Sequence, residues 1–114
     1  MSSASLNLFE RAILDWVAER TSDTALSTQL QSATVKRRDY TRTGFFVYLI
    51  AEDQCENVGS TVRPQCPHIT ISELMDGAGC NLFLRNGRLH YLEIYARGGF
   101  IPETVDVFKL EEEQ

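Results

Sequence analysis

Apolar residues near the start of the chain recur at three- and four-residue spacing, which is typical of a helix with one buried face. Residues 5–21 carry this pattern, and Ser5 is the expected N-cap because its hydroxyl can accept an N–H of the first turn. Polar residues such as Glu10 occupy the other faces. Five residues form the apolar stripe: Leu6, Phe9, Ile13, Trp16 and Val17.

After a polar break, Leu26 and Leu30 predict a second, short helix over residues 24–32.

From residue 33 onward the pattern is typical of strands. Residues 35–42 are polar on both faces, which fits an edge strand whose charges discourage pairing with another chain. Residues 45–51 are almost entirely apolar and predict a central strand covered on both faces. Residues 52–67 show no sustained period and predict a long loop, and further strands are expected over residues 69–74 and 104–110.

Asn86-Gly87 lies between two apolar runs and predicts a hairpin with a two-residue type I′ turn, joining residues 80–85 to residues 88–96. A regular register opposite this turn pairs Leu84 with Leu89 and Cys80 with Glu93. One face of the hairpin then carries Cys80, Leu82, Leu84, Leu89 and Tyr91, with Glu93 at its far end. The other face carries Phe83, His90, Leu92 and Ile94.

These elements predict an α+β fold. An amphipathic N-terminal helix and a short second helix pack on a mainly antiparallel sheet of four to six strands, with the hairpin next to strand 45–51 or close by. The length of 114 residues suits a single domain over residues 1–114. The hydrophobic fraction of 43% is that of a globular chain, which excludes a disordered one.

Composition also narrows the compartment and the partners. No apolar run reaches the roughly 20 residues that a membrane helix needs, and the first residues do not form a secretory signal, so we expect a cytoplasmic protein without a membrane partner. The net charge of −5 argues against binding to nucleic acid. Lys36, Arg37, Arg38 and Arg42 form one basic run with Tyr40 interleaved, for which a solvated edge strand is the favoured interpretation and a nucleic-acid surface the other.

Glu93 is the main candidate for chemistry. The predicted register directs this carboxylate along an apolar face, where it must be paired, hydrogen-bonded or protonated. The simpler interpretation is a structural ion pair with Arg42 or Arg97, or simple exposure where the sheet ends. The other makes Glu93 a weak candidate for a catalytic acid or base, or part of a ligand site with Tyr91 and Arg42.

The cysteines and histidines predict no cofactor and no metal site. Three cysteines in a chain without an export signal indicate reduced thiols, although Cys55 and Cys66 could close a loop in an oxidising compartment. Cys55, Cys66 and His68 lack the Cys-x₂₋₄-Cys spacing of structural zinc sites.

Several short motifs between about residues 26 and 110 resemble a group of short bacterial proteins of unknown function. A glycine is common in that group where this chain has Ile94, and a tryptophan where it has Ile101. The resemblance implies a bacterial cytosolic protein and supplies no activity or site residue. The motifs are Arg38-Asp39-Tyr40-Thr41, Gly44-Phe45-Phe46, Gly77-Ala78-Gly79, Leu82-Phe83, Gly87-Arg88-Leu89, Leu92-Glu93 and Pro102-Glu103.

Without a catalytic motif, the leading hypothesis is a non-enzymatic binding protein. It would act through a sheet face, through the loop 52–67 or by dimerisation, with itself or another protein as partner. The second hypothesis is a small ligand-binding protein or enzyme with Glu93 in a pocket between helix and sheet. The third is a regulator that contacts nucleic acid through residues 36–42.

Overall fold

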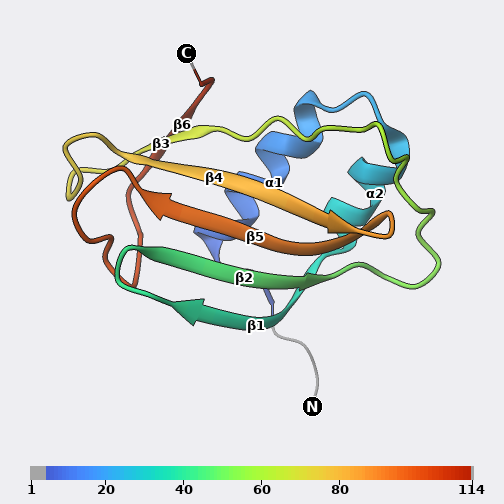
Figure 1. Ribbon diagram of the computed structural model, residues 1–114, viewed down its shortest axis with the longest axis horizontal. Helices are drawn as coiled ribbons and strands as arrows, with labels where there is room; N and C mark the ends of the chain where they lie inside the picture. Colours follow the sequence, from blue (N-terminus) through green and yellow to red (C-terminus); the bar gives the residue numbers. More distant parts are fainter. Residues whose placement is uncertain (1–4, 114) are drawn as a thin grey trace.

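The computed structural model describes residues 5–113, which form two helices packed on one side of a six-stranded antiparallel sheet (Figure 1). The predicted α+β class is confirmed. The strands follow the order β1-β2-β5-β4-β3-β6 across the sheet. Their bounds are β1 Thr34–Tyr40, β2 Gly44–Ile50, β3 His68–Thr70, β4 Ala78–Arg85, β5 Arg88–Ala96 and β6 Lys109–Glu111.

Helix α1 (Leu8–Arg20) begins later than the apolar pattern predicts, and the N-cap is Asn7, so the assignment of Ser5 is wrong. The Asn7 side chain accepts the backbone N–H of Glu10 at 2.8 Å, and the Glu10 carboxylate accepts the N–H of Asn7 at 3.0 Å. This reciprocal capping box satisfies two donors at once, which a serine two residues earlier cannot do. Helix α2 (Thr24–Ser32) has the predicted bounds, with Asp23 as its N-cap.

Strand β1 is an edge strand, as its charges predict, and the neighbour of β2 on the other side is β5 of the hairpin, also as predicted. The middle of the sheet is formed by β5 and β4 instead of β2. The apolar run of β2 still fits its position, because alternate side chains face the helices and the others form an aromatic surface on the opposite face.

The strands predicted over residues 69–74 and 104–110 are much shorter than the sequence pattern indicates. After Thr70 the chain turns, with the N–H of Leu74 bonded to the carbonyl of Ile71, so β3 ends well before residue 74. Strand β6 contains only three residues and pairs with β3. Residues 51–67 contain no helix or strand, which confirms the long loop.

The hydrophobic core lies between the sheet and the helices. Ile13, Leu14 and Leu26 from the helices have no exposed surface, and neither have Val47 and Leu92 from the sheet. The polar side chain of Gln29 is also fully buried there. Its amide donates to the carbonyls of Glu56 and Gly87 at 2.7 and 2.8 Å, and its oxygen accepts the N–H of Leu89 at 2.9 Å. Gln29 thus connects α2, the long loop and the hairpin.

The hairpin turn has the predicted geometry, with φ of 53° at Asn86 and 77° at Gly87. Leu84 pairs with Leu89 as expected, but the register shifts immediately afterwards, so that Phe83 pairs with Tyr91 and Cys80 with Ile94. His90 is the extra residue of a β-bulge in β5. The predicted register is therefore wrong from His90 onward.

Candidate functional site

The face of the sheet opposite the helices presents two rows of side chains that cross four strands. Residues paired across neighbouring strands point to the same face. The first row runs from Arg37 through Tyr48 and Tyr91 to Phe83, and the second from Asp39 through Phe46 and Glu93 to Asn81. Because the alternate residues are buried against the helices, we call this surface the open face.

Five ring side chains gather on the open face around Tyr91. The ring of Phe83 stacks on Tyr91 with a centroid distance of 4.5 Å and is 39% exposed. The remaining rings lie 5.0–5.9 Å from Tyr91, in edge-on or tilted orientations. We call this set the aromatic cluster: Phe46, Tyr48, Phe83, His90 and Tyr91. Phe83 is the exposed ring of this cluster and the other four are half-buried, so the packed rings form a partly solvent-accessible surface.

Glu93 lies on this open face, so its predicted position on the core-facing side is wrong. The bulge at His90 turns Tyr91 and Glu93 outward and brings Leu92 and Ile94 into the core. Glu93 accepts a long hydrogen bond of 3.4 Å from Asn81. It therefore lies away from the helix–sheet interface in which a pocket was expected.

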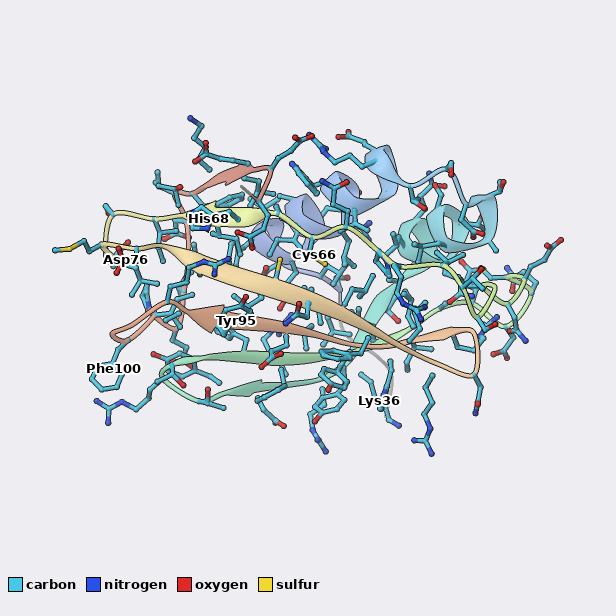
Figure 2. All side chains as sticks on the ribbon, turned by 45° about the horizontal axis from the view of Figure 1, so that its top comes forward. Lys36, Cys66, His68, Asp76, Tyr95 and Phe100 are labelled. Carbon is cyan, nitrogen blue, oxygen red and sulfur yellow. The ribbon has the colours of Figure 1, made fainter. Side chains whose placement is uncertain are left out.

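The structure brings two of the three predicted ligand-site residues together. Tyr91 and Glu93 are in neighbouring rows of the open face, whereas Arg42 lies in the turn after β1, with its guanidinium over the ring of Phe100. No ion pair of residues 5–113 joins Glu93 to Arg42 or Arg97. Figure 2 shows Phe100 and Lys36 well apart along the lower side of the molecule, so the basic run is not one patch.

Internal contacts divide the basic run further. Arg38 lies on the helix side of β1, where its guanidinium forms an ion pair with Glu10. Arg37 lies on the open face, 3.3 Å from the carboxylate of Asp39 and with its guanidinium carbon 4.3 Å from the ring centroid of Tyr48. The hydroxyl of Tyr40 donates to the carbonyl of Ile101 at 2.6 Å.

A groove of about 670 Å³ opens at one end of the open face, between two β-bulges. Lys36 is the extra residue of the bulge in β1, and His90 is that of the bulge in β5. The two bulges lie on either side of the same part of β2, and both extra residues line the groove. Tyr48 and Ile50 of β2 line it between them. We call this cavity the bulge groove.

The bulge groove has a cationic lining. Lys36, Arg37 and Arg88 contribute positive charge, and none of the described residues that line it is an aspartate or glutamate. Arg88 is already engaged, because its guanidinium donates to the carbonyls of Glu52 and Cys55 at 2.6 and 2.5 Å. Among the hydrogen bonds and ion pairs of residues 5–113, none involves the side chains of Lys36, Tyr48 or His90.

The three thiols are free. Cys55 lies next to the hydroxyl of Ser32, with 3.5 Å between sulfur and oxygen, and no disulfide joins it to Cys66. Cys66 lies beside β4 (Figure 2), where a hydrogen bond from the Cys80 thiol lowers its pKa. Cys80 is buried, and donation to Cys66 together with desolvation raises its own pKa. The single thiol hydrogen of Cys80 can be donated to Cys66 or to the carbonyl of Pro67, 3.4 Å away.

The structure does not bring together Cys55, Cys66 and His68, the three residues that the sequence offered as zinc ligands. Cys66 contacts Cys80, and the Nδ1 of His68 lies 3.2 Å from the Nε of Arg97. No group of three or more histidine, cysteine, aspartate or glutamate side chains suited to a metal ion occurs among residues 5–113. Within the same range, no helix has both the length and the apolar character required to cross a bilayer.

Sequence reasoning missed Gln29 and Glu10, the two polar side chains among the buried residues of the described chain. It also missed both bulges, although one signal was present. Leu89 and Leu92 are three positions apart, and both can face the core only if an extra residue intervenes.

Comparison with protein-family models, curated proteins and solved structures finds no match for this chain. These comparisons do not test the resemblance to the bacterial group, so membership of that group stays a prediction.

Proposed function

We propose that this protein is a non-enzymatic binding domain that recognises another protein through the open face of its sheet. The observation that carries this proposal is the aromatic cluster on a face that neither helix covers. Phe83 is 39% exposed at the end of its row and stacks on the ring of Tyr91. A large side chain in this position loses little conformational freedom when a partner buries it.

The residue types on the open face support a protein partner. Tyrosine, phenylalanine and arginine are enriched in protein interfaces, where a few stacked rings supply most of the binding free energy. Tyr48, Tyr91 and Phe83 form one continuous row with Arg37 at its end. That row gives the open face both an apolar centre and a charged border.

Charge favours a partner with an acidic surface. The cations Lys36, Arg37 and Arg88 line the groove at one end of this face, and no carboxylate of the described residues lines it. Lys36 adds a positive charge beside the row, whereas the whole chain carries a net charge of −5. A positive border on an acidic protein attracts a negatively charged partner to this face and repels a positively charged one.

A second copy of the chain fits this face less well than a different protein. In a two-fold dimer the same patch meets itself. Such a dimer would bury Lys36 and Arg37 of both copies in one interface, and buried charged side chains lower affinity unless each finds an opposite charge.

The proposal can be tested with a displayed library of random twelve-residue peptides, selected on the intact chain. We expect enriched peptides that combine aspartate or glutamate with an aromatic or leucine residue. Truncation of Phe83 or Tyr91 to alanine should weaken a synthetic peptide of this kind at least about tenfold, as is usual for an interface hot spot. Leu8→Ala is the matched control, because Leu8 is 87% exposed on α1, which packs on the other face. This variant should bind the peptide as the unaltered chain does.

Three results would contradict the proposal. The first is a library without any peptide whose binding depends on Phe83 or Tyr91. The second is a monomer–dimer equilibrium in sedimentation that Phe83→Ala abolishes, because it assigns the face to a second copy. The third is binding of oligo(dT) that the same variant removes, because it assigns the rings to base stacking. Thermal unfolding of each variant checks that loss of binding is not loss of fold.

A further inference from the structure

We infer that the bulge groove is a binding site for a small planar anion, such as an aryl carboxylate or an aryl phosphate. This inference goes beyond the proposed protein partner and is carried by other residues. The observation behind it is that two separate β-bulges direct nitrogen-bearing side chains into one cavity. Lys36 comes from β1 and His90 from β5, and each is the unpaired extra residue of its strand.

A bulge points a side chain in a new direction and interrupts the regular hydrogen bonds between the two strands. One bulge on an edge strand is sufficiently explained by protection against pairing with other chains. That explanation does not apply to β5, which lies between β2 and β4 inside the sheet. The common result of both bulges is the groove, because Lys36 and His90 line it from opposite sides of β2.

The lining supplies donors that the described part of the chain does not use. None of the hydrogen bonds or ion pairs of residues 5–113 involves the ammonium of Lys36, the imidazole of His90 or the hydroxyl of Tyr48. All three side chains line the same groove. An ammonium, a hydroxyl and an imidazole N–H together can donate to the oxygens of one carboxylate, sulfonate or phosphate.

The same groove has features that favour a planar molecule. The ring of Tyr48 lies between the guanidinium of Arg37, with 4.3 Å from guanidinium carbon to ring centroid, and the rings of His90 and Tyr91. Ile50, which is 41% exposed, adds an apolar wall. The volume of about 670 Å³ lies in the range of small-molecule sites, roughly 300–1,000 Å³. Since no carboxylate lines it, the groove disfavours cations.

The test uses 8-anilinonaphthalene-1-sulfonate, an aromatic anion with planar rings whose fluorescence rises on binding, titrated onto the intact chain. The matched probe is N-phenyl-1-naphthylamine, which has the same rings without the sulfonate. We expect one bound molecule of the anionic dye per chain and at least about tenfold weaker binding of the neutral one, because a charge-assisted contact is lost. Benzoate and phenyl phosphate should displace the anionic dye, and the better competitor identifies the class of anion.

Variants locate the site. Lys36→Gln and Arg37→Gln should each weaken the dye about five- to tenfold, since each removes one charged donor. Lys109→Gln is the matched control, because Lys109 lies on β6 at the other edge of the sheet. It should leave binding unchanged, and circular dichroism should show the same fold for all three variants.

Equal affinity for the charged and neutral dyes would overturn the inference, as would failure of both benzoate and phenyl phosphate to compete. Dye binding that Phe83→Ala abolishes but Lys36→Gln leaves intact would also overturn it, because the dye would then lie on the aromatic cluster. None of these outcomes bears on the peptide selection, which tests the proposed function. The inference and the proposed function can therefore fail separately.

Discussion

The carboxylate of Glu10 on α1 accepts two hydrogen bonds from the guanidinium of Arg38 on β1, at 2.5 and 2.6 Å. Only 2% of the Glu10 side chain is exposed, against 33% of Arg38. The hydrogen bonds and negative charge of Glu10 raise the pKa of Arg38, so its guanidinium keeps its positive charge. It joins the first turn of the helix to the edge of the sheet.

The two halves of this pair should differ in their effect on stability. Arg38→Met leaves a buried carboxylate without its counter-charge and should lower the free energy of unfolding by about 3–5 kcal/mol. Glu10→Gln leaves Arg38 within reach of water and keeps a capping box, so about 1–2 kcal/mol is expected. Urea unfolding at pH 7 measures both values. Equal losses, or a larger loss for Glu10→Gln, would contradict this account.

Replacing the buried Gln29 by leucine should lower stability by about 2–4 kcal/mol, because buried polar groups lose their partners. The carbonyl of Glu56 and the N–H of Leu89 would each lose the hydrogen bond that Gln29 makes. Gln31→Leu is the control, since Gln31 is exposed on the same helix. Urea unfolding at pH 7 measures the loss of stability in both variants. A smaller loss for Gln29→Leu than for Gln31→Leu would argue that Gln29 is not a structural link.

The thiol of Cys80 should control the reactivity of Cys66. Because donation from Cys80 lowers the pKa of Cys66, the Cys66 thiolate forms at a lower pH than in an ordinary cysteine. Cys80→Ala removes that donor, so the midpoint of the pH profile for alkylation of Cys66 should move upward. Rates of iodoacetamide labelling, followed by mass spectrometry in a Cys55→Ser background, give this midpoint. An unchanged midpoint would show that the donor lies elsewhere.

Deletion of His90 should be tolerated much better than deletion of Glu93. His90 is the extra residue of the bulge, so its removal leaves Leu89 and Leu92 facing the core. Deleting Glu93 would turn Ile94 outward and misplace the rest of β5. We expect losses of about 1–2 kcal/mol and at least about 4 kcal/mol, respectively. Thermal unfolding gives the comparison, and nuclear Overhauser contacts between Phe83 and Tyr91 report whether the register is kept.

Local signals in the sequence were sufficient for most elements. Asn86-Gly87 forms the expected turn because both positions need a positive φ, and this requirement involves only those two residues. The helix bounds at α2 and the edge position of β1 likewise follow from short stretches of sequence. By contrast, the central position of β4 and β5 depends on strand order, which no single strand encodes.

The candidate site was harder to predict because one residue decides which way a strand faces. A regular register placed Glu93 inward, and the bulge at His90 reversed every later side chain of β5. The burial of Glu10 was hidden for a different reason. Its partner Arg38 lies 28 positions later, so polarity alone places Glu10 on a solvated face. The bulge groove depends on two such irregularities meeting across β2.

The hydrogen bonds of Gln29 also bear on the order in which the chain folds. The hairpin around Asn86-Gly87 is a local structure that can form early, but Gln29 lies 58 positions before Gly87 and 60 before Leu89. Contacts over such separations are slow to form because a long loop must first be closed. We therefore expect the contacts of Gln29 with the hairpin tip to form after the turn itself, when α2 arrives. Without residues 5–32, the inner side of the hairpin would be open to water.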